Sequence, residues 1–354
     1  KNTRHRDSAP TPHTAERYLQ PYAIGFNNDT YMAIYATNVL LDDEKDHELW
    51  FRSEMTHRQF LALAHRLSNS DIENEIINLD FFRNRLKAAQ NLNLKEVEKW
   101  LRNAWNTENI LHSNSIIIAE SAQPFALQWA FPQSYYSVFG TLLAHYNALG
   151  YSETSHTAVI KKFGRLVIEN KLPESVCFLA NGGRKRITYS NIARPTNHQS
   201  IDLDLSIPET VDNQICQFLK TSREIKLIEK APELIKALKI KTAKGSNKKH
   251  LSPNDWQKIS DQIGITTIMD LLYRKRIKAN YLDTEIFTFE RLKGREILEN
   301  LCIIVDRLNL INETYIAKAI KEKEYLRMKN EFSKRLSLKV LDDRSTTVLT
   351  LINS

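Results

Sequence analysis

The chain has 354 residues, of which 42% are hydrophobic and 26% charged, as in an ordinary soluble globular protein. It has no apolar run of about eighteen residues, so we expect no membrane span, and the charged residues 1–7 lack the apolar core of a signal peptide. Three widely separated cysteines (Cys177, Cys216 and Cys302) argue against a disulfide framework and favour a reduced, cytoplasmic setting.

The formal net charge is +8, which makes an anionic partner the first class to consider, with nucleic acid as its leading member. The sequence has no His-Glu-x-x-His pair, no cysteine pair with metal spacing and no Gly-rich phosphate loop. It also lacks a serine-hydrolase elbow. We therefore expect neither a metal nor a cofactor.

Helix is the predicted secondary structure for most of the chain, because only nine glycines accompany long stretches rich in Leu, Ile, Lys and Glu. Residues 1–20 are rich in Pro, Thr and charge, which predicts a tail. A helix is expected up to about Leu67, beginning after the acidic residues 42–44 or at Ser53. Another is expected near 71–90 with Asp71 as its N-cap, and from Leu94 onwards apolar residues recur at helical spacing.

The stretch 135–146 is predicted to be a helix with one apolar face. That face carries Tyr136, Phe139, Leu142, Leu143 and Tyr146. Ser155 is a suitable N-cap for a second helix, which should end before Pro173.

Two basic segments stand out in the middle of the chain. A Gly182-Gly183 turn precedes three cations, and a lysine-rich stretch at 236–250 is expected to form an exposed loop. Ser252 and Pro253 then restart a helix. The RNA-binding candidates are Arg184, Lys185, Arg186, Lys248 and Lys249, because exposed cations are the groups that contact phosphates.

Towards the C-terminus, a turn is expected around 264–267, followed by a helical segment at 269–276. A long apolar helix is predicted from about Phe287 to Leu308, and a charged helix over 312–335. The tail from Thr346 to Ile352 is predicted to be a short strand or a frayed end.

Three of these segments share a pattern with a known family. The first is Tyr135-Tyr136-Ser137-Val138-Phe139, the second is Ser155-His156 with the apolar residues that follow, and the third is Arg276-Ile277-Lys278-Ala279-Asn280-Tyr281. In this order they resemble the HEPN family, small all-helical domains of prokaryotic toxins, defence proteins and partners of nucleotidyltransferases. The resemblance is to the family's Tyr-Tyr-x-x-Phe helix, the start of its next helix and the Arg-x-x-Ala-Asp/Asn-Tyr opening of its last helix.

The resemblance implies a four-helix bundle built from residues 94–174 and 263–320, with its first helix near 94–107. Where the family has a short link, this chain has residues 175–262, which we interpret as a basic, helical or irregular insertion. Residues 1–93 are then an N-terminal extension of unknown role, and residues 321–354 a C-terminal helix and tail. The resemblance covers less than half of the chain.

Catalytic HEPN proteins use an Arg, a polar neighbour and a His a few residues later on the last helix. Metal-free RNA cleavage needs a cation to hold the phosphate and a group of near-neutral pKa to move the 2′-hydroxyl proton. In this chain Arg276 is followed by apolar Ile277, and Tyr281 stands where a His is expected, so the family pattern is incomplete.

Arg residues followed by a His at the spacing of the family pattern occur instead before Leu67. Arg52 is followed by His57, and Arg58 by His65, which makes both pairs further catalytic candidates beside Arg276 and Tyr281. A solvated helical face is the alternative interpretation of these four residues. Three residues inside the matching motifs are structural or ligand-contacting candidates: Tyr136, His156 and Asn280.

Two functional hypotheses follow from the resemblance. In the first, this is a HEPN-like protein of a prokaryotic defence or toxin system that binds RNA through the basic insertion and is a candidate metal-independent endoribonuclease. In the second, the bundle is a non-catalytic dimerisation or scaffold subunit for a partner effector enzyme. The resemblance also implies a homodimer or membership of a defence complex.

Overall fold

A computed structural model describes most of the chain. The described residues are 44–117, 123–152, 154–193, 203–282, 294–334 and 339–354, with the side chains of 44–47, 117, 123–125, 281 and 282 excepted. Residues 49–354 form one compact unit, and residues 1–48, of which only 44–48 are described, form another. The tail predicted at residues 1–20 lies outside the described residues.

The described chain is mainly helical, which confirms the predicted fold class. The α-helices are α3 (Glu44–Ser68), α4 (Ile72–Asn78), α5 (Leu94–Ile117), α6 (Gln123–Ala148), α7 (His156–Ile168), α8 (Pro208–Ala237), α9 (Pro253–Ile263), α10 (Ile268–Ile277), α12 (Gly294–Ile320), α13 (Glu322–Ser333) and α14 (Lys339–Asn353). Shorter elements are η2 (Phe81–Arg85), η4 (Glu174–Val176), η5 (Lys278–Leu282) and the strands β1 (Leu179–Asn181) and β2 (Thr188–Ser190).

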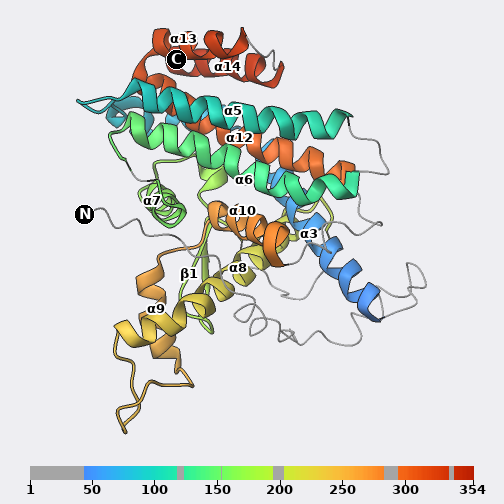
Figure 1. The fold of residues 1–354 in the computed structure, drawn as a ribbon, viewed down its shortest axis with the longest axis vertical. Helices are drawn as coiled ribbons and strands as arrows, with labels where there is room; N and C mark the ends of the chain where they lie inside the picture. The colour runs from blue at the N-terminus through green and yellow to red at the C-terminus, as the bar shows by residue number, and fades with distance from the viewer. Residues whose placement is uncertain (1–43, 118–122, 153, 194–202, 283–293, 335–338) are drawn as a thin grey trace, which may run out of the picture. The chain divides into compact units, whose positions relative to one another are not determined.

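Three long helices, α5, α6 and α12, lie side by side (Figure 1). The predicted apolar face of α6 is buried except for Tyr136, which is 36% exposed. Polar residues of the same helix are also fully buried, including Ser137, Thr141 and His145. Helix α6 is therefore enclosed on nearly all sides over this stretch. The prediction of a single apolar face was incomplete, because polar residues on other faces of the helix are buried as well.

Helices α7 and α10 both pack against α6, so the residues on either side of the segment 175–262 come together in space. Ser155 is the N-cap of α7 as predicted, with its hydroxyl accepting a hydrogen bond from the Ala158 amide at 3.2 Å. Thr267 and Asp270 form a capping box that starts α10. The boundaries assigned to the bundle and to the insertion stay predictions.

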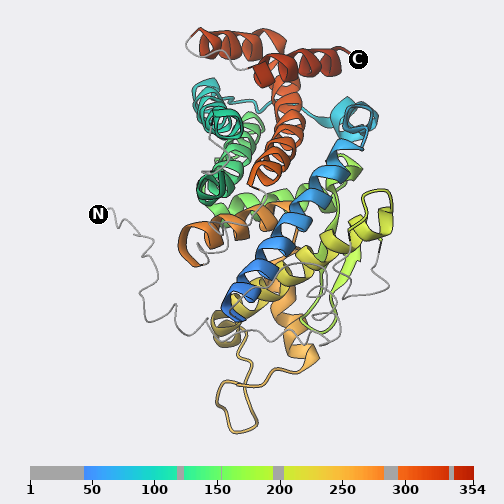
Figure 2. The same ribbon diagram turned by 90° about the vertical axis from the view of Figure 1, so that its right-hand side faces the viewer.

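The segment between these two parts contains a short antiparallel hairpin, β1–β2, and the helices α8 and α9 (Figure 2). Gly182 has φ +91°, and a Cβ at this position would lie 2.1 Å from the carbonyl oxygen of Arg186. The hairpin turn therefore requires glycine here. A second apolar cluster joins α8, the following loop and α9: Leu227, Ala231, Ile240 and Ile259.

Several predicted boundaries were wrong. The helix expected over 71–90 has the predicted cap, since Asp71 accepts from the Asn74 amide at 3.1 Å, but it ends at Asn78 where Leu79 becomes extended. Helix α6 begins before Pro132 and continues through it, because burial on both sides of the proline outweighs the lost backbone hydrogen bond. The start predicted near Phe287 lies outside the described residues.

The C-terminal predictions were also wrong. Helix α12 continues to Ile320, Lys321 adopts φ 75°, and α13 begins after this break instead of one helix running over 312–335. The stretch 346–352, expected to be a short strand or a frayed end, is part of α14. Its buried residues Leu341, Val348 and Leu351 have helical spacing, but the polar residues buried between them interrupt the apolar pattern in the sequence.

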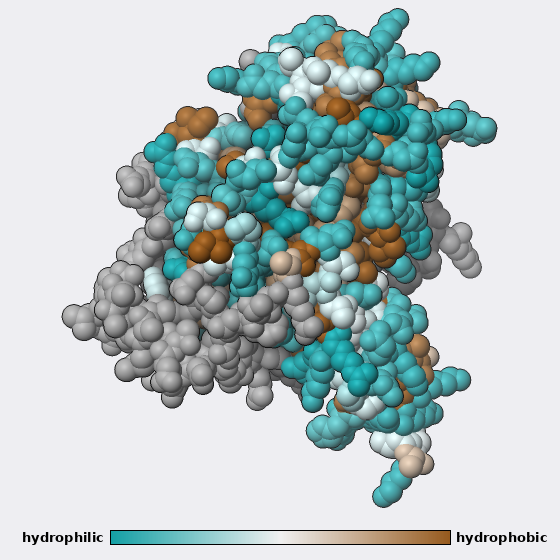
Figure 3. Space-filling view, turned by 180° about the vertical axis from the view of Figure 1, so that it is seen from behind, coloured by the Kyte–Doolittle hydropathy of each residue, from teal (hydrophilic) through white to brown (hydrophobic). Residues whose placement is uncertain are grey.

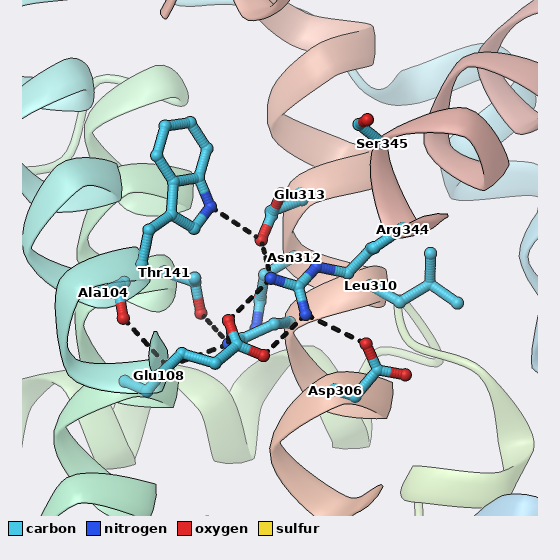
Figure 4. A network of polar contacts seen from close by, with 12 residues as sticks. Ala104, Glu108, Thr141, Asp306, Leu310, Asn312, Glu313, Arg344 and Ser345 are labelled. Atoms are coloured by element: carbon cyan, nitrogen blue, oxygen red, sulfur yellow. Dashed lines mark hydrogen bonds and ion pairs between the residues drawn. The ribbon is translucent and has the colours of Figure 1, made fainter. Parts of the chain in front are cut away.

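One of those polar residues, Arg344, forms a buried ion network that fastens α14 to the three long helices (Figure 4). Its guanidinium lies 2.6 Å from the carboxylate of Glu108, 2.9 Å from that of Glu313 and 3.0 Å from that of Asp306. Burial opposes ionisation of both glutamates. For Glu108 the charge of Arg344 prevails and lowers the pKa, whereas for Glu313 burial prevails and raises the pKa.

We predict that Arg344→Met lowers the free energy of unfolding by about 3–5 kcal/mol, because the change leaves two buried glutamates without their cation. Urea-induced unfolding measures this loss. The matched control is Arg327→Met, which removes an arginine whose 3.0 Å contact with Glu98 is partly exposed. It should cost less than about 1 kcal/mol. Equal losses in the two variants would contradict the assigned role of Arg344.

His145 is a second buried polar group in this core. Its Nδ1 lies 3.2 Å from the side-chain oxygen of Asn312, and its ring meets that of Tyr315 edge to face at a centroid distance of 5.3 Å. Burial lowers the pKa of His145 from 6.5 to about 4. Between about pH 4 and pH 6.5 the imidazole is therefore neutral in the folded state, whereas in the unfolded chain it binds a proton.

We predict that the stability contributed by neutral His145 is complete above pH 6.5 and is lost as the pH falls towards 4. The unfolding free energy of the wild type should drop over this interval by roughly 2–4 kcal/mol more than that of His145→Gln, which does not titrate. Chemical unfolding at a series of pH values measures the difference. Parallel pH curves for the two proteins would show that His145 is not the titrating group.

Candidate functional site

Residues of two of the segments singled out in the sequence meet Tyr273, just before the third segment, in one aromatic cluster on α6, α7 and α10. We call Tyr135, Tyr136, Phe139, His156 and Tyr273 the tyrosine–histidine cluster. The Tyr135 hydroxyl lies 2.8 Å from Nδ1 of His156, and the His156 and Phe139 ring centroids are 4.5 Å apart. Tyr135 is also 5.4 Å from Tyr273, ring to ring, so all three helices contribute to the cluster.

Arg276, one turn after Tyr273 on α10, borders this cluster. Its guanidinium donates a hydrogen bond to the Tyr136 hydroxyl and lies 5.1 Å from the centroid of that ring and 5.8 Å from that of Tyr273. The His156 ring lies 6.0 Å and 5.7 Å from the same two tyrosine rings. Arg276 and His156 therefore flank one pair of tyrosines although they are far apart in the sequence.

The chemistry of the cluster is set by a buried phenol beside an imidazole. Burial, together with the neighbouring Tyr273, raises the pKa of Tyr135, so its hydroxyl keeps its proton at any physiological pH. A neutral phenol can donate to a bare Nδ1 or accept from a protonated one. The contact with Tyr135 thus orients His156 in either of its protonation states.

The remaining candidates near Arg276 lie in the short element η5, directly after α10. Asn280 is half-buried there, and the side chain of Tyr281 lies outside the described residues. Element η5 packs against α6. The backbone after Arg276 is therefore held on the same helix as the tyrosine–histidine cluster.

The candidates His57, Arg58 and His65 on α3 each contact other side chains, one of which lies on α12. His57 is 3% exposed, and its Nε2 lies 3.2 Å from Glu296. Arg58 donates to Glu54 at 2.7 Å, and His65 contacts the Asn69 amide at 3.1 Å. No described contact joins Arg58 to His65 or Arg52 to His57.

Glu54 organises part of this helix. Burial would raise its pKa, but contacts with His57 and Arg58 lower it to about 2. Both residues are therefore neighbours of a carboxylate that stays ionised, which supports a structural role for them on α3.

The three cations after Gly183 are exposed, and the turn that leads into them contacts α9. The Gly183 amide donates to the side chain of Gln257 at 3.3 Å, and the Arg184 guanidinium lies 5.9 Å from the ring centroid of Trp256. The loop that leads into α9 carries further exposed lysines. We call this set the basic surface: Arg184, Lys185, Arg186, Lys241, Lys244, Lys249 and Lys258.

The loop and α9 form a largely hydrophilic end of the described chain (Figure 3). Residues 236–258 contain seven lysines and a single acid, Asp255. Asp255 is paired with neighbouring residues. Its contacts with Lys248, at 2.9 Å, and with Ser252 lower its pKa to about 2. Lys248, a predicted RNA contact, therefore braces the start of α9, whereas Lys249 is exposed.

A buried arginine that sequence reasoning missed holds the hairpin turn in place. Arg223 on α8 is fully buried and donates to the carbonyl oxygen of Gly182 at 3.2 Å, to that of Gly264, and to the Ser260 hydroxyl at 2.7 Å. Burial lowers its pKa to about 10, so it remains charged at neutral pH. The turn and the end of α9 are thus joined through one side chain.

Neither a metal site nor a membrane span is found in the described part of the chain. Among those residues no group of three His, Cys, Asp or Glu side chains is placed to hold an ion. No described helix is both long and apolar enough to cross a bilayer. The three cysteines are buried, and burial raises the pKa of each thiol to about 12.

Comparison with protein-family models, curated proteins and solved structures finds no match for this chain. Two features are therefore the candidate sites on geometry alone. One is the tyrosine–histidine cluster with Arg276, and the other is the basic surface around α9.

Proposed function

We propose that this protein binds RNA through the basic surface, as a HEPN-like protein of a prokaryotic defence or toxin system. The observation that carries the proposal is the exposed turn Arg184–Arg186 held against α9, next to a loop rich in lysine. A homodimer and a partner effector enzyme stay predictions from the family resemblance.

The physical basis is electrostatic. Exposed cations bind backbone phosphates and release condensed counterions, which gives affinity without sequence specificity and makes it fall steeply with salt. Arg223 and the contact between Gly183 and Gln257 fix the turn, so three of these cations are presented together from a firm support. Fixing the cations reduces the ordering cost of binding.

We predict that Arg184→Ala, Lys185→Ala and Arg186→Ala combined weaken RNA binding at least tenfold at 100 mM salt. Fluorescence anisotropy with a labelled RNA measures the affinity over a salt series. The slope of log affinity against log salt is negative. If each cation contacts one phosphate, this slope should become less steep by about 2 in the triple variant, since each contact with a single strand contributes about 0.7.

The matched control replaces three exposed lysines elsewhere, Lys87, Lys95 and Lys323, by alanine. It changes the net charge by the same amount but leaves the basic surface intact. Equal weakening by both triple variants would indicate a nonspecific charge effect and contradict this location. Failure of the wild type to bind any tested RNA would overturn the proposed function.

A second activity, RNA cleavage without a metal, is favoured by the placement of His156 and Arg276 around the same two tyrosine rings. The family pattern asks for a His after the Arg on one helix, and we propose that His156 of α7 takes that role here. In the proposed step the 2′-oxygen attacks phosphorus while His156 accepts its proton, and the P–O5′ bond breaks. Arg276 holds the non-bridging oxygens, and the departing 5′-oxygen takes a proton from solvent water, which is restored when His156 releases its own proton, giving a 2′,3′-cyclic phosphate and a 5′-hydroxyl.

We predict that the wild type cleaves RNA in the presence of EDTA and that His156→Ala and Arg276→Ala each reduce the rate at least a hundredfold. Tyr135→Phe should reduce it less, because it removes only the group that orients the imidazole. Gel analysis of a labelled RNA measures the rates, and the ends of the products identify the cyclic phosphate.

The control variants are Arg58→Ala and His65→Ala on α3, which should cleave as fast as the wild type. Loss of cleavage in these variants, but not in His156→Ala, would move the site to α3. Absence of cleavage by a wild type that still binds RNA would support the alternative function, a non-catalytic scaffold subunit.

A further inference from the structure

Trp256 lies in the first turns of α9 and contacts the basic surface at Arg184. It is half-buried and packs against the apolar cluster formed by Leu227, Ala231, Ile240 and Ile259. The guanidinium of Arg184 lies over its ring, 5.9 Å from the centroid. The Trp256 ring therefore packs against an apolar cluster and also contacts an exposed cation, Arg184.

The backbone is arranged to keep these two side chains together. A Cβ at Gly183 would lie 3.0 Å from the Gln257 amide nitrogen and 3.0 Å from the Trp256 carbonyl carbon, so the turn approaches α9 as closely as glycine permits. The capping box of Ser252 and Asp255, braced by Lys248, fixes the helix that carries the ring. The Trp256 ring and the turn that carries the three cations are therefore held against each other.

We propose that the basic surface binds single-stranded RNA, with an unpaired base stacked on Trp256 while Arg184 moves to a phosphate. The proposal rests on the RNA binding proposed above and names its substrate class. Bases in a duplex are stacked on one another and present only their edges, whereas unpaired bases can stack on an aromatic ring or an arginine plane. A surface that combines one indole ring with exposed cations is therefore suited to a strand whose bases are unpaired.

The exposed position of Arg184 allows this exchange. Its side chain has no ion pair among the described contacts, and a cation–π contact at an exposed site is weak. A stacked base is held more strongly, so replacing the guanidinium by a base is favourable when a phosphate accepts the arginine. The turn itself need not move.

The test compares one labelled RNA oligonucleotide with its duplex by fluorescence anisotropy, using the full chain in EDTA. The single strand should bind at least tenfold more tightly than the duplex. Trp256→Leu should weaken single-strand binding about tenfold and leave duplex binding unchanged, and Trp256→Tyr should retain single-strand affinity to within about threefold. Trp129→Leu, which removes a 59% exposed tryptophan on α6, is the matched control and should have no effect.

Thermal unfolding of each variant checks that the fold is retained. If Trp256→Leu is destabilised, Gly183→Ala provides the second probe, since it forces the turn away from the ring and should also weaken single-strand binding. Equal affinity for strand and duplex, with both variants unaffected, would overturn the stacking proposal but leave RNA binding at the basic surface standing. Absence of binding to either RNA would overturn both proposals.

Discussion

The buried charge of Arg344 is the interaction on which the arrangement of the long helices depends. Its partners Glu108 and Glu313 come from α5 and α12, and Arg344 itself comes from α14, so one guanidinium joins three helices in the core. Asn309 extends the network by donating to Glu108 and to Ser137 on α6. A charge cluster of this kind tolerates few alternative packings, because each shift of a helix would leave a charged or polar group without its partner.

Fixing α6 also fixes the tyrosine–histidine cluster. Tyr135 and Phe139 are on the turns of α6 next to Ser137, and they present their rings to α7 and α10. The network and the cluster thus occupy different sides of one helix. The functional candidates are positioned through this cluster, since His156 contacts the core residues Tyr135 and Phe139 and Arg276 contacts Tyr136.

Local signals in the sequence were sufficient for caps and turns but not for long-range polar contacts. Ser155, Asp71 and the Ser252–Asp255 box were predictable because capping depends on neighbours within four residues. Helix α14 was missed because Arg344, the residue that anchors it, interrupts its apolar pattern. The placement of His156 and Arg276 against the same two tyrosine rings, and the burial of Arg223, depend on helices distant in the sequence, and no spacing rule reports them. The family resemblance and its catalytic assignment stay predictions.

Helix α10 connects the two candidate sites. Thr266, just before it, pairs with Ala180 of the hairpin through backbone hydrogen bonds, and Arg276 lies in its last turn. Ten helical residues at about 1.5 Å each separate the two ends by about 15 Å. Any molecule that contacts both ends of α10 at once must therefore span at least this distance.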